Sequence, residues 1–142
     1  LVADSGTPIP VAHPRGDFVH WALADLPADL REIAAGSCSD GIDPRGKPAG
    51  RDAGGVRGLN DYTGWFAGDP AMGGQYFGYD GPCPPWNDEL LHHYHFALFA
   101  TDLARCPVEG PFSGQQLRAA LQGHVRAAAR PTGTYSLNPK VR

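Results

Sequence analysis

Alternating apolar positions mark two segments of the sequence as strands. β-Branched and aromatic residues cluster from Phe18 to Leu23, and alternation places His20 on one face of this segment. The longer run from Leu91 to Leu103 alternates in the same way, with His92 and Tyr94 on a shared face. Because both faces of each segment are largely apolar, we expect both strands to lie in the middle of a sheet.

One helix is predicted near the C-terminus, from residue 113 to residue 129. Ser113 is a suitable N-cap, and Gln116 follows three residues later, which is the spacing of a capping box. The residues that follow place apolar side chains at helical spacing: Leu117, Ala120, Leu121, Val125 and Ala128. The segment from Gly133 to Leu137 is then predicted to form a last short strand.

Glycine and proline dominate the stretch from Gly36 to Pro85, where we expect little regular structure. The stretch ends in the sequence GPCPP, residues 81–85. Long ordered loops in compact domains are commonly functional, and prolines fix the backbone while leaving its carbonyls open. One wall of a binding site is therefore predicted at GPCPP.

Composition places the chain among folded, loop-rich proteins. Its 142 residues suit a single domain, residues 1–142, and 42% of them are apolar despite 19 glycines and 14 prolines. The 12 basic and 15 acidic residues are scattered and give a net charge of −3, so no basic stripe predicts binding to nucleic acid. No apolar run approaches the roughly 20 residues that cross a bilayer, and no membrane span is expected.

Cysteine usage favours a reducing compartment. Cys38, Cys83 and Cys106 form an odd set without a CxxC pair, which argues against a disulfide framework and against a structural zinc site. We therefore expect a cytoplasmic protein. Cys83 is interpreted as a small buried residue, and no cofactor is expected.

Histidines carry most of the candidate chemistry. Three of the six lie in one predicted strand, but His92 faces one side, whereas His93 and His95 face the other. A single metal ion could not collect all three, and no carboxylate or thiolate pattern accompanies them, so no metal site is expected. His93 and His95 are interpreted as hydrogen-bonded or surface histidines.

His20 and His92, opposite a loop rich in glycine and proline, suggest an anion site. Imidazole rings donate hydrogen bonds to phosphate or carboxylate oxygens, Tyr94 adds a hydroxyl donor, and main-chain amides around Gly81 complete the set. The alternative is a core histidine pair bonded to nearby backbone. No GxSxG motif or other nucleophile setting occurs, and no catalytic residue is assigned.

Three motifs together resemble the phosphatidylethanolamine-binding protein family, most closely its bacterial Raf-kinase-inhibitor-like branch. They are FVHW at residues 18–21, GYDGPCPP at 78–85 and HHYHFALFATD at 92–102. The sequence LQGHVRAAARPTGTY is similar to the C-terminal helix and strand of the family. The resemblance implies a mostly β fold, an antiparallel Greek-key β-sandwich with a few peripheral helices.

The resemblance also implies a small-anion pocket. Its residues would be the strand histidine, the loop wall and the second motif's histidine and tyrosine: His20, Gly81, Pro82, Pro84, His92 and Tyr94. His93 replaces the arginine that is more usual in the family. The family's DPDxP motif has no counterpart, since Asp4 is a poor match, so the resemblance implies that the chain starts after that motif and lacks the family's N-terminal strands.

The function implied by the resemblance is binding of phosphate or a phospholipid head group such as phosphoethanolamine, together with regulation or inhibition of a protein kinase or protease. Two alternatives stay open. One is a hydrolase that uses His20, His92 and Tyr94 for acid–base chemistry. The other is a dimerising interaction protein whose loop from Gly36 to Tyr76 forms the homodimer contact, with a vestigial pocket.

Overall fold

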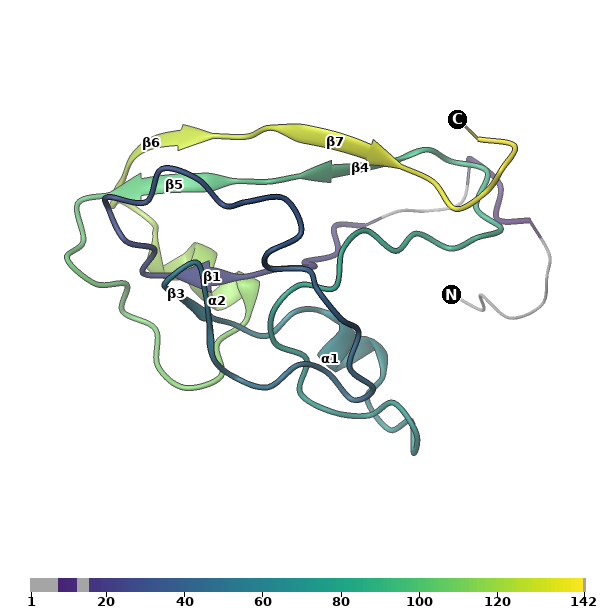
Figure 1. Cartoon of the computed structure of the whole chain (residues 1–142), viewed down its shortest axis with the longest axis horizontal. Coiled ribbons are helices and arrows are strands. Elements are labelled where there is room, and N and C mark those ends of the chain that lie inside the picture. Colours follow the sequence, from purple (N-terminus) through teal and green to yellow (C-terminus); the bar gives the residue numbers. More distant parts are fainter. Residues whose placement is uncertain (1–7, 13–15, 142) are drawn as a thin grey trace. The chain divides into compact units, whose positions relative to one another are not determined.

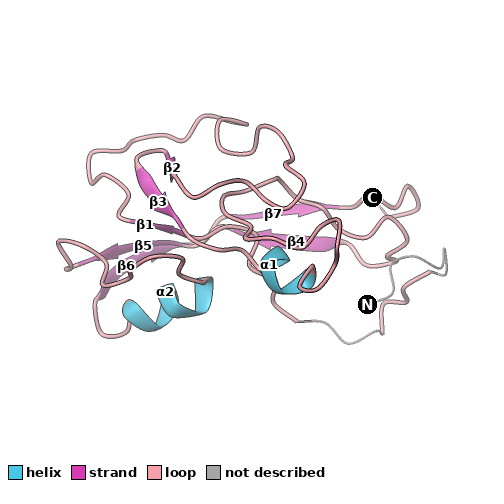
Figure 2. Cartoon of the chain, turned by 90° about the horizontal axis from the view of Figure 1, so that it is seen from below, coloured by secondary structure: helices cyan, strands magenta, loops and turns pink. Residues whose placement is uncertain are grey.

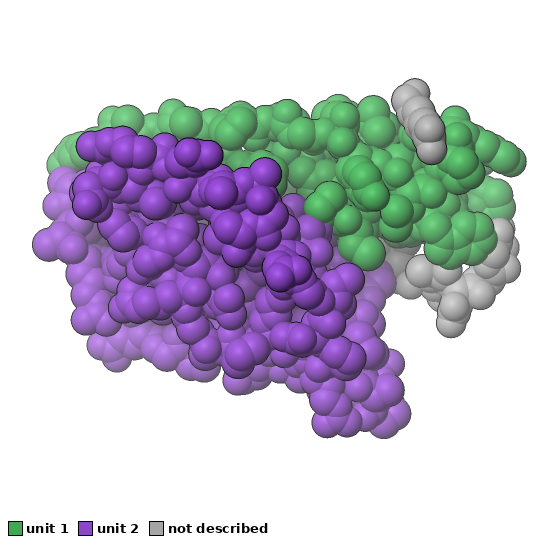
Figure 3. All heavy atoms as spheres, in the orientation of Figure 1, with its two compact units in different colours: residues 1–17, 82–100, 126–142 green, residues 18–81, 101–125 purple. Residues whose placement is uncertain are grey.

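The computed structural model describes residues 8–12 and 16–141, so Asp4 lies outside the described residues. The chain forms two compact units, coloured separately in Figure 3: unit 1 comprises residues 1–17, 82–100 and 126–142, and unit 2 comprises residues 18–81 and 101–125. The described residues are mostly β, with two short helices and small open sheets. The Greek-key β-sandwich and the single domain stay predictions. No helix in the described ranges is long and apolar enough to cross a membrane.

Unit 2 contains a three-stranded antiparallel sheet in the order β1-β3-β2. Its strands are β1 (Leu23–Ala24), β2 (Arg51–Asp52) and β3 (Gly55–Arg57). Strands β2 and β3 are joined by Ala53 and Gly54, which have φ angles of 49° and 86°. Two successive positive φ angles are what a tight two-residue hairpin loop requires. The stretch from residue 36 to residue 85 is therefore more regular than predicted, and it also contains helix α1 (Tyr62–Trp65).

The core of unit 2 includes side chains from its sheet and from helix α2 (Gly114–Ala120), which is drawn in cyan in Figure 2. Phe112 is only 3% exposed and packs with Ala22, Ala24 and Cys106, against partly buried side chains that include Leu117 of α2. The predicted capping box is confirmed, because the Gln116 amide donates to Ser113 Oγ at 3.2 Å and the Ser113 amide donates to Gln116 Oε1 at 2.8 Å.

The prediction of a helix over residues 113–129 is wrong beyond Ala120. Gly123, with a φ of 80°, follows the end of the helix, and residues 125–129 form strand β6 (Val125–Ala129). A glycine in the left-handed region just after a helix is a common stop signal. Strand β6 pairs with β5 (Leu98–Thr101), so tertiary pairing overrides the helix propensity of its alanines.

The prediction of a strand from Phe18 to Leu23 is largely wrong, since strand β1 includes only its last residue. The preceding segment is held by a different set of bonds. The Val19 amide donates to the Asp61 carboxylate at 2.7 Å, and the Asp61 amide donates to the Val19 carbonyl at 2.9 Å. The Asp61 side chain thus replaces a neighbouring strand as the acceptor for Val19.

The predicted strand from residue 91 to residue 103 is two strands, β4 (His92–His95) and β5. Figure 1 shows β4 beside β7 (Thr132–Tyr135) and β5 beside β6. Between them the Phe96 amide donates to the Pro131 carbonyl at 2.9 Å. Proline has no amide hydrogen to return, so the ladder is interrupted there. The last predicted strand, from Gly133, is confirmed as β7.

Replacing Phe112 with alanine is expected to lower the free energy of unfolding by about 3–5 kcal/mol, the usual cost of truncating a buried phenylalanine. Phe112→Leu, which keeps most of the apolar volume, should retain most of the stability. Urea unfolding followed by circular dichroism measures both. A loss below about 1 kcal/mol for Phe112→Ala, the ordinary effect of a point substitution, would show that this ring does not anchor the core.

Candidate functional site

The six predicted site residues are divided between the two compact units. Unit 2 contains His20 and Gly81, and unit 1 contains Pro82, Pro84, His92 and Tyr94. Each unit therefore has its own part of the predicted set, with its own local contacts.

In unit 1, strand β4 brings together His92, Tyr94 and a carboxylate that the sequence analysis did not identify. His92 Nε2 lies 2.8 Å from Asp88 Oδ2, and the two side chains are 26% and 1% exposed. The rings of His92 and Tyr94 are stacked with centroids 6.5 Å apart, as expected for alternate residues on one face of a strand. The only sequence signal for Asp88 was an acid four residues before a strand histidine.

Hydrogen bonds and a main-chain bridge fix the position of Asp88. Its Oδ1 accepts a hydrogen bond from the Leu90 amide at 2.9 Å, and its carbonyl accepts one from the Asn138 side chain at 2.9 Å. Ile9 forms a parallel bridge to it. Because an ionised carboxylate only accepts hydrogen bonds, His92 has to donate from Nε2, and ring atom Nδ1 is the one turned away from Asp88.

The histidines on the opposite face of β4 have no part in this arrangement. His93 is exposed, and His95 Nδ1 lies 2.8 Å from Thr132 Oγ1. Both observations agree with their interpretation as surface or hydrogen-bonded histidines. Within the described residues, no group of three or more His, Cys, Asp or Glu side chains could hold a metal ion.

The GPCPP loop differs from expectation at one position. Pro82 is exposed and Pro84 is buried, but Cys83 between them is exposed, so its interpretation as a small buried residue is wrong. Proline on each side fixes the local φ angles. The cysteine side chain is therefore held on the outside of the loop.

In unit 2, His20 lies in a cluster of aromatic rings. Its ring centroid is 4.9 Å from that of Phe18 and 5.6 Å from that of Tyr62, which belongs to α1. Edge and tilted ring contacts of this kind add to the stabilisation from apolar burial. The position of His20 is thus set by aromatic packing.

Trp21, the residue after His20, forms a second group of contacts. Its indole N–H donates to Asp52 at 3.2 Å, Arg57 donates to the same carboxylate at 2.6 Å, and the Trp21 ring stacks on Tyr79 at 5.4 Å. The hydrogen bond that Arg57 donates to Asp52 raises the pKa of the Arg57 guanidinium, and burial raises the pKa of the Tyr79 phenol. At neutral pH the guanidinium is therefore charged and the phenol is neutral.

Gly81 ends a segment, residues 76–81, that includes Tyr79, whose ring stacks on Trp21. Its φ is 90°, which favours glycine, and it is buried. A Cβ atom built at Gly81 would nevertheless meet no atom within 4 Å beyond the neighbouring residues. A side chain at this position would therefore meet no steric clash, and the positive φ is what favours glycine here.

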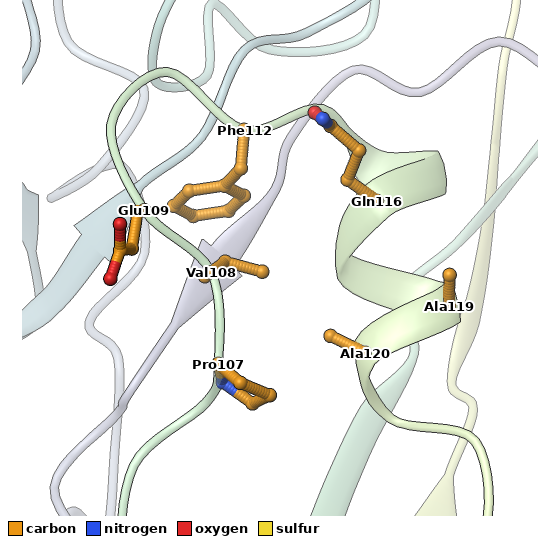
Figure 4. A pocket seen from close by; sticks show the side chains of 7 residues that line it. All are labelled: Pro107, Val108, Glu109, Phe112, Gln116, Ala119 and Ala120. Atoms are coloured by element: carbon orange, nitrogen blue, oxygen red, sulfur yellow. The ribbon is translucent and has the colours of Figure 1, made fainter.

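A separate hollow in unit 2 contains none of the six predicted residues. Figure 4 shows Ala120 of α2 and Val108 directed into it from opposite sides. Phe112 of its lining belongs to the hydrophobic core and Val108 and Ala120 pack against that core, and we assign the hollow no ligand.

Comparison with known proteins decides the family. Residues 1–136 match the family model described as phosphatidylethanolamine-binding protein. The chain belongs to this family.

Curated relatives of this phosphatidylethanolamine-binding protein family member occur in archaea and bacteria. A UPF0098 protein of Pyrococcus horikoshii is 32% identical over 123 residues, which cover 86% of the chain and 51% of that protein. A UPF0098 protein of Chlamydia pneumoniae is 29% identical over 84% of the chain and 60% of its own length. The UPF0098 protein YbcL of Escherichia coli is 27% identical over 83% of the chain and 54% of its own length. The chain thus spans about half the length of these relatives, and no solved structure matches it.

Replacing Asp88 with alanine is expected to lower the free energy of unfolding by about 2–3 kcal/mol, because it leaves the partly buried Leu90 amide and the His92 ring without their acceptor. Because the His92 side chain is 26% exposed, water replaces part of its lost interaction, so the loss is smaller than for a fully buried pair. Proton NMR should also show that the His92 Nε2–H, slow to exchange with water in the wild type, exchanges rapidly in the variant. His93→Ala is the matched control and should change stability by less than about 0.5 kcal/mol. Equal exchange in wild type and Asp88→Ala would contradict the assigned hydrogen bond.

Proposed function

We propose that this member of the family is a binding protein for a small anion, either phosphate or a phosphorylated head group such as phosphoethanolamine. The residues proposed to contact the anion are His20, Gly81, Pro82, Pro84, His92 and Tyr94. We further propose that occupancy of this site regulates a partner enzyme, for which the resemblance suggests a protein kinase or a protease. The hydrolase and homodimer alternatives and the cytoplasmic location stay predictions.

The Asp88–His92 pair is the observation that carries the proposal. The buried Asp88 carboxylate, 2.8 Å from His92 Nε2, fixes the plane and direction of the imidazole ring. Asp88 does not use the second ring nitrogen, Nδ1. Hydrogen bonds between an imidazole ring and the charged oxygens of a phosphate are charge-assisted and belong to the strong class.

Two further features support an anion as the ligand. Tyr94 shares the face of His92 on β4, and a phenol hydroxyl can donate to the same kind of oxygen. Gly81 combines a positive φ with open space at its Cα, which lets a ligand approach the main chain closely. Side-chain charge, a hydroxyl and main-chain amides are the donor types that anion sites combine.

Calorimetric titration of the intact chain with phosphate and with O-phosphorylethanolamine tests the proposal. His92→Ala removes a charge-assisted donor and is expected to weaken binding by about tenfold to a hundredfold. His93→Ala, one residue away on the opposite face and exposed, is the matched control and should bind like the wild type. Absence of binding by the wild type, or equal losses in the two variants, would contradict the proposal.

A further inference from the structure

Lys47 and Asp80 form an ion pair within unit 2 that is largely withdrawn from water. Lys47 Nζ lies 3.1 Å from Asp80 Oδ1, and the two side chains are 7% and 14% exposed. Lysine is rarely buried to this extent without a partner. Neither residue belongs to the set proposed to contact the anion, but Asp80 directly precedes Gly81 in the sequence.

The same ammonium group also holds the main chain of this segment. Lys47 Nζ donates to the Tyr79 carbonyl at 2.6 Å, and the Phe77 amide donates to the Lys47 carbonyl at 3.2 Å. The Asn60 side chain supports Gly78, which lies between Phe77 and Tyr79. Its amide donates to the Gly78 carbonyl at 3.1 Å. Residues 77–80 are thus fixed by one buried lysine and one buried asparagine.

Gly78 shows how closely this segment packs on its supports. Its φ is 74°, and a Cβ atom there would lie 3.4 Å from Lys47 Cδ and 3.4 Å from Arg57 Nε. These are ordinary van der Waals distances, so the Lys47 stem and the Arg57 side chain pass close to the main chain at Gly78. The position of the Lys47 ammonium relative to this segment is set by its bond to the Tyr79 carbonyl and its ion pair with Asp80.

The positive charge of Lys47 has a second effect, which acts on the Asp80 carboxylate. A carboxylate one residue from Gly81 would repel an anion bound at the Gly81 main chain, and in a partly dry environment such repulsion is stronger than in bulk water. Lys47 neutralises that carboxylate at 3.1 Å. Without it, Asp80 would oppose the ligand that the site is proposed to bind.

We propose that Lys47 is a positioning residue for the anion site: it fixes the main chain that leads to Gly81 through the Tyr79 carbonyl, and it neutralises the Asp80 carboxylate beside that site. This inference rests on the proposed function.

A double-mutant cycle with inorganic phosphate tests the inference on the intact chain. Lys47→Met keeps the length of the side chain but removes its charge, and should weaken phosphate binding by about tenfold or more. Asp80→Asn removes the repelling carboxylate and leaves Lys47 bonded to Tyr79, so it should tighten binding by about threefold or more. The double variant should recover part of the loss of Lys47→Met, because the charge effect is gone and only the positional effect is left.

Lys140→Met is the matched control, since Lys140 is the other lysine of the chain and is exposed. It makes the same change in net charge without touching residues 76–81 and should bind phosphate like the wild type. Circular dichroism and thermal unfolding establish that each variant is folded before its affinity is compared. If Lys47→Met does not fold, Asp80→Asn decides, and unchanged or weaker binding by that variant overturns the inference.

The outcomes separate this inference from the proposed function. If the wild type binds phosphate and His92→Ala does not, but folded Lys47→Met binds like the wild type, the inference is wrong and the proposed function stands. A double variant that binds no better than Lys47→Met overturns the charge effect. If the wild type binds no phosphate, the proposed function fails, and the role of Lys47 fails with it.

Discussion

A charged side chain withdrawn from water costs several kcal/mol unless a partner of opposite charge and further hydrogen bonds replace its hydration. This constraint shapes the segments that contain the predicted ligand residues. In unit 1, Asp88 is 1% exposed and is paired with His92, which opens strand β4. In unit 2, the Asp52 side chain is 5% exposed and is paired with Arg57. The first pair ties the loop at Asp88 to strand β4 and the second joins β2 to β3, so the ion pairs fix the backbone as well as the charges.

The ion pairs also make the short strands and helices more rigid than their length alone would make them. Strands of two to five residues and helices of four and seven residues bury little apolar surface by themselves. The two-stranded pairing of β4 with β7 is anchored at its beginning by Asp88, which also bonds to Leu90 and Asn138. Ligand residues on such elements depend on these side-chain contacts for their precision.

Local sequence rules predicted the features that depend on neighbours in the chain. The Ser113–Gln116 capping box, the shared face of His92 and Tyr94, and the strand at Thr132–Tyr135 all follow from spacing alone. Features that depend on distant residues were missed. Alanines after Gly123 form a strand because β5 pairs with them, and Pro131 interrupts the strand that begins at His92.

The candidate site likewise has features that the sequence predicted and features that it did not. Motif resemblance identified the family, and the family model confirms it over residues 1–136. Asp88 could not be found from spacing, because an acid four residues before a strand histidine has no periodic relation to it until the chain turns between them. Lys47 is 33 positions before Asp80, and nothing in either segment signals their pairing. Long-range ion pairs of this kind become visible only in the folded structure.

The central proposal is that His92, oriented by Asp88, and His20 contribute to anion binding. Side-chain ¹⁵N NMR of the intact chain during a phosphate titration tests this at each ring. The account predicts that the ring nitrogens of His92 and His20 shift with a common saturation curve while those of His93, His95 and His124 stay unchanged. Shifts confined to the latter three, or no shift at any ring, would contradict the account.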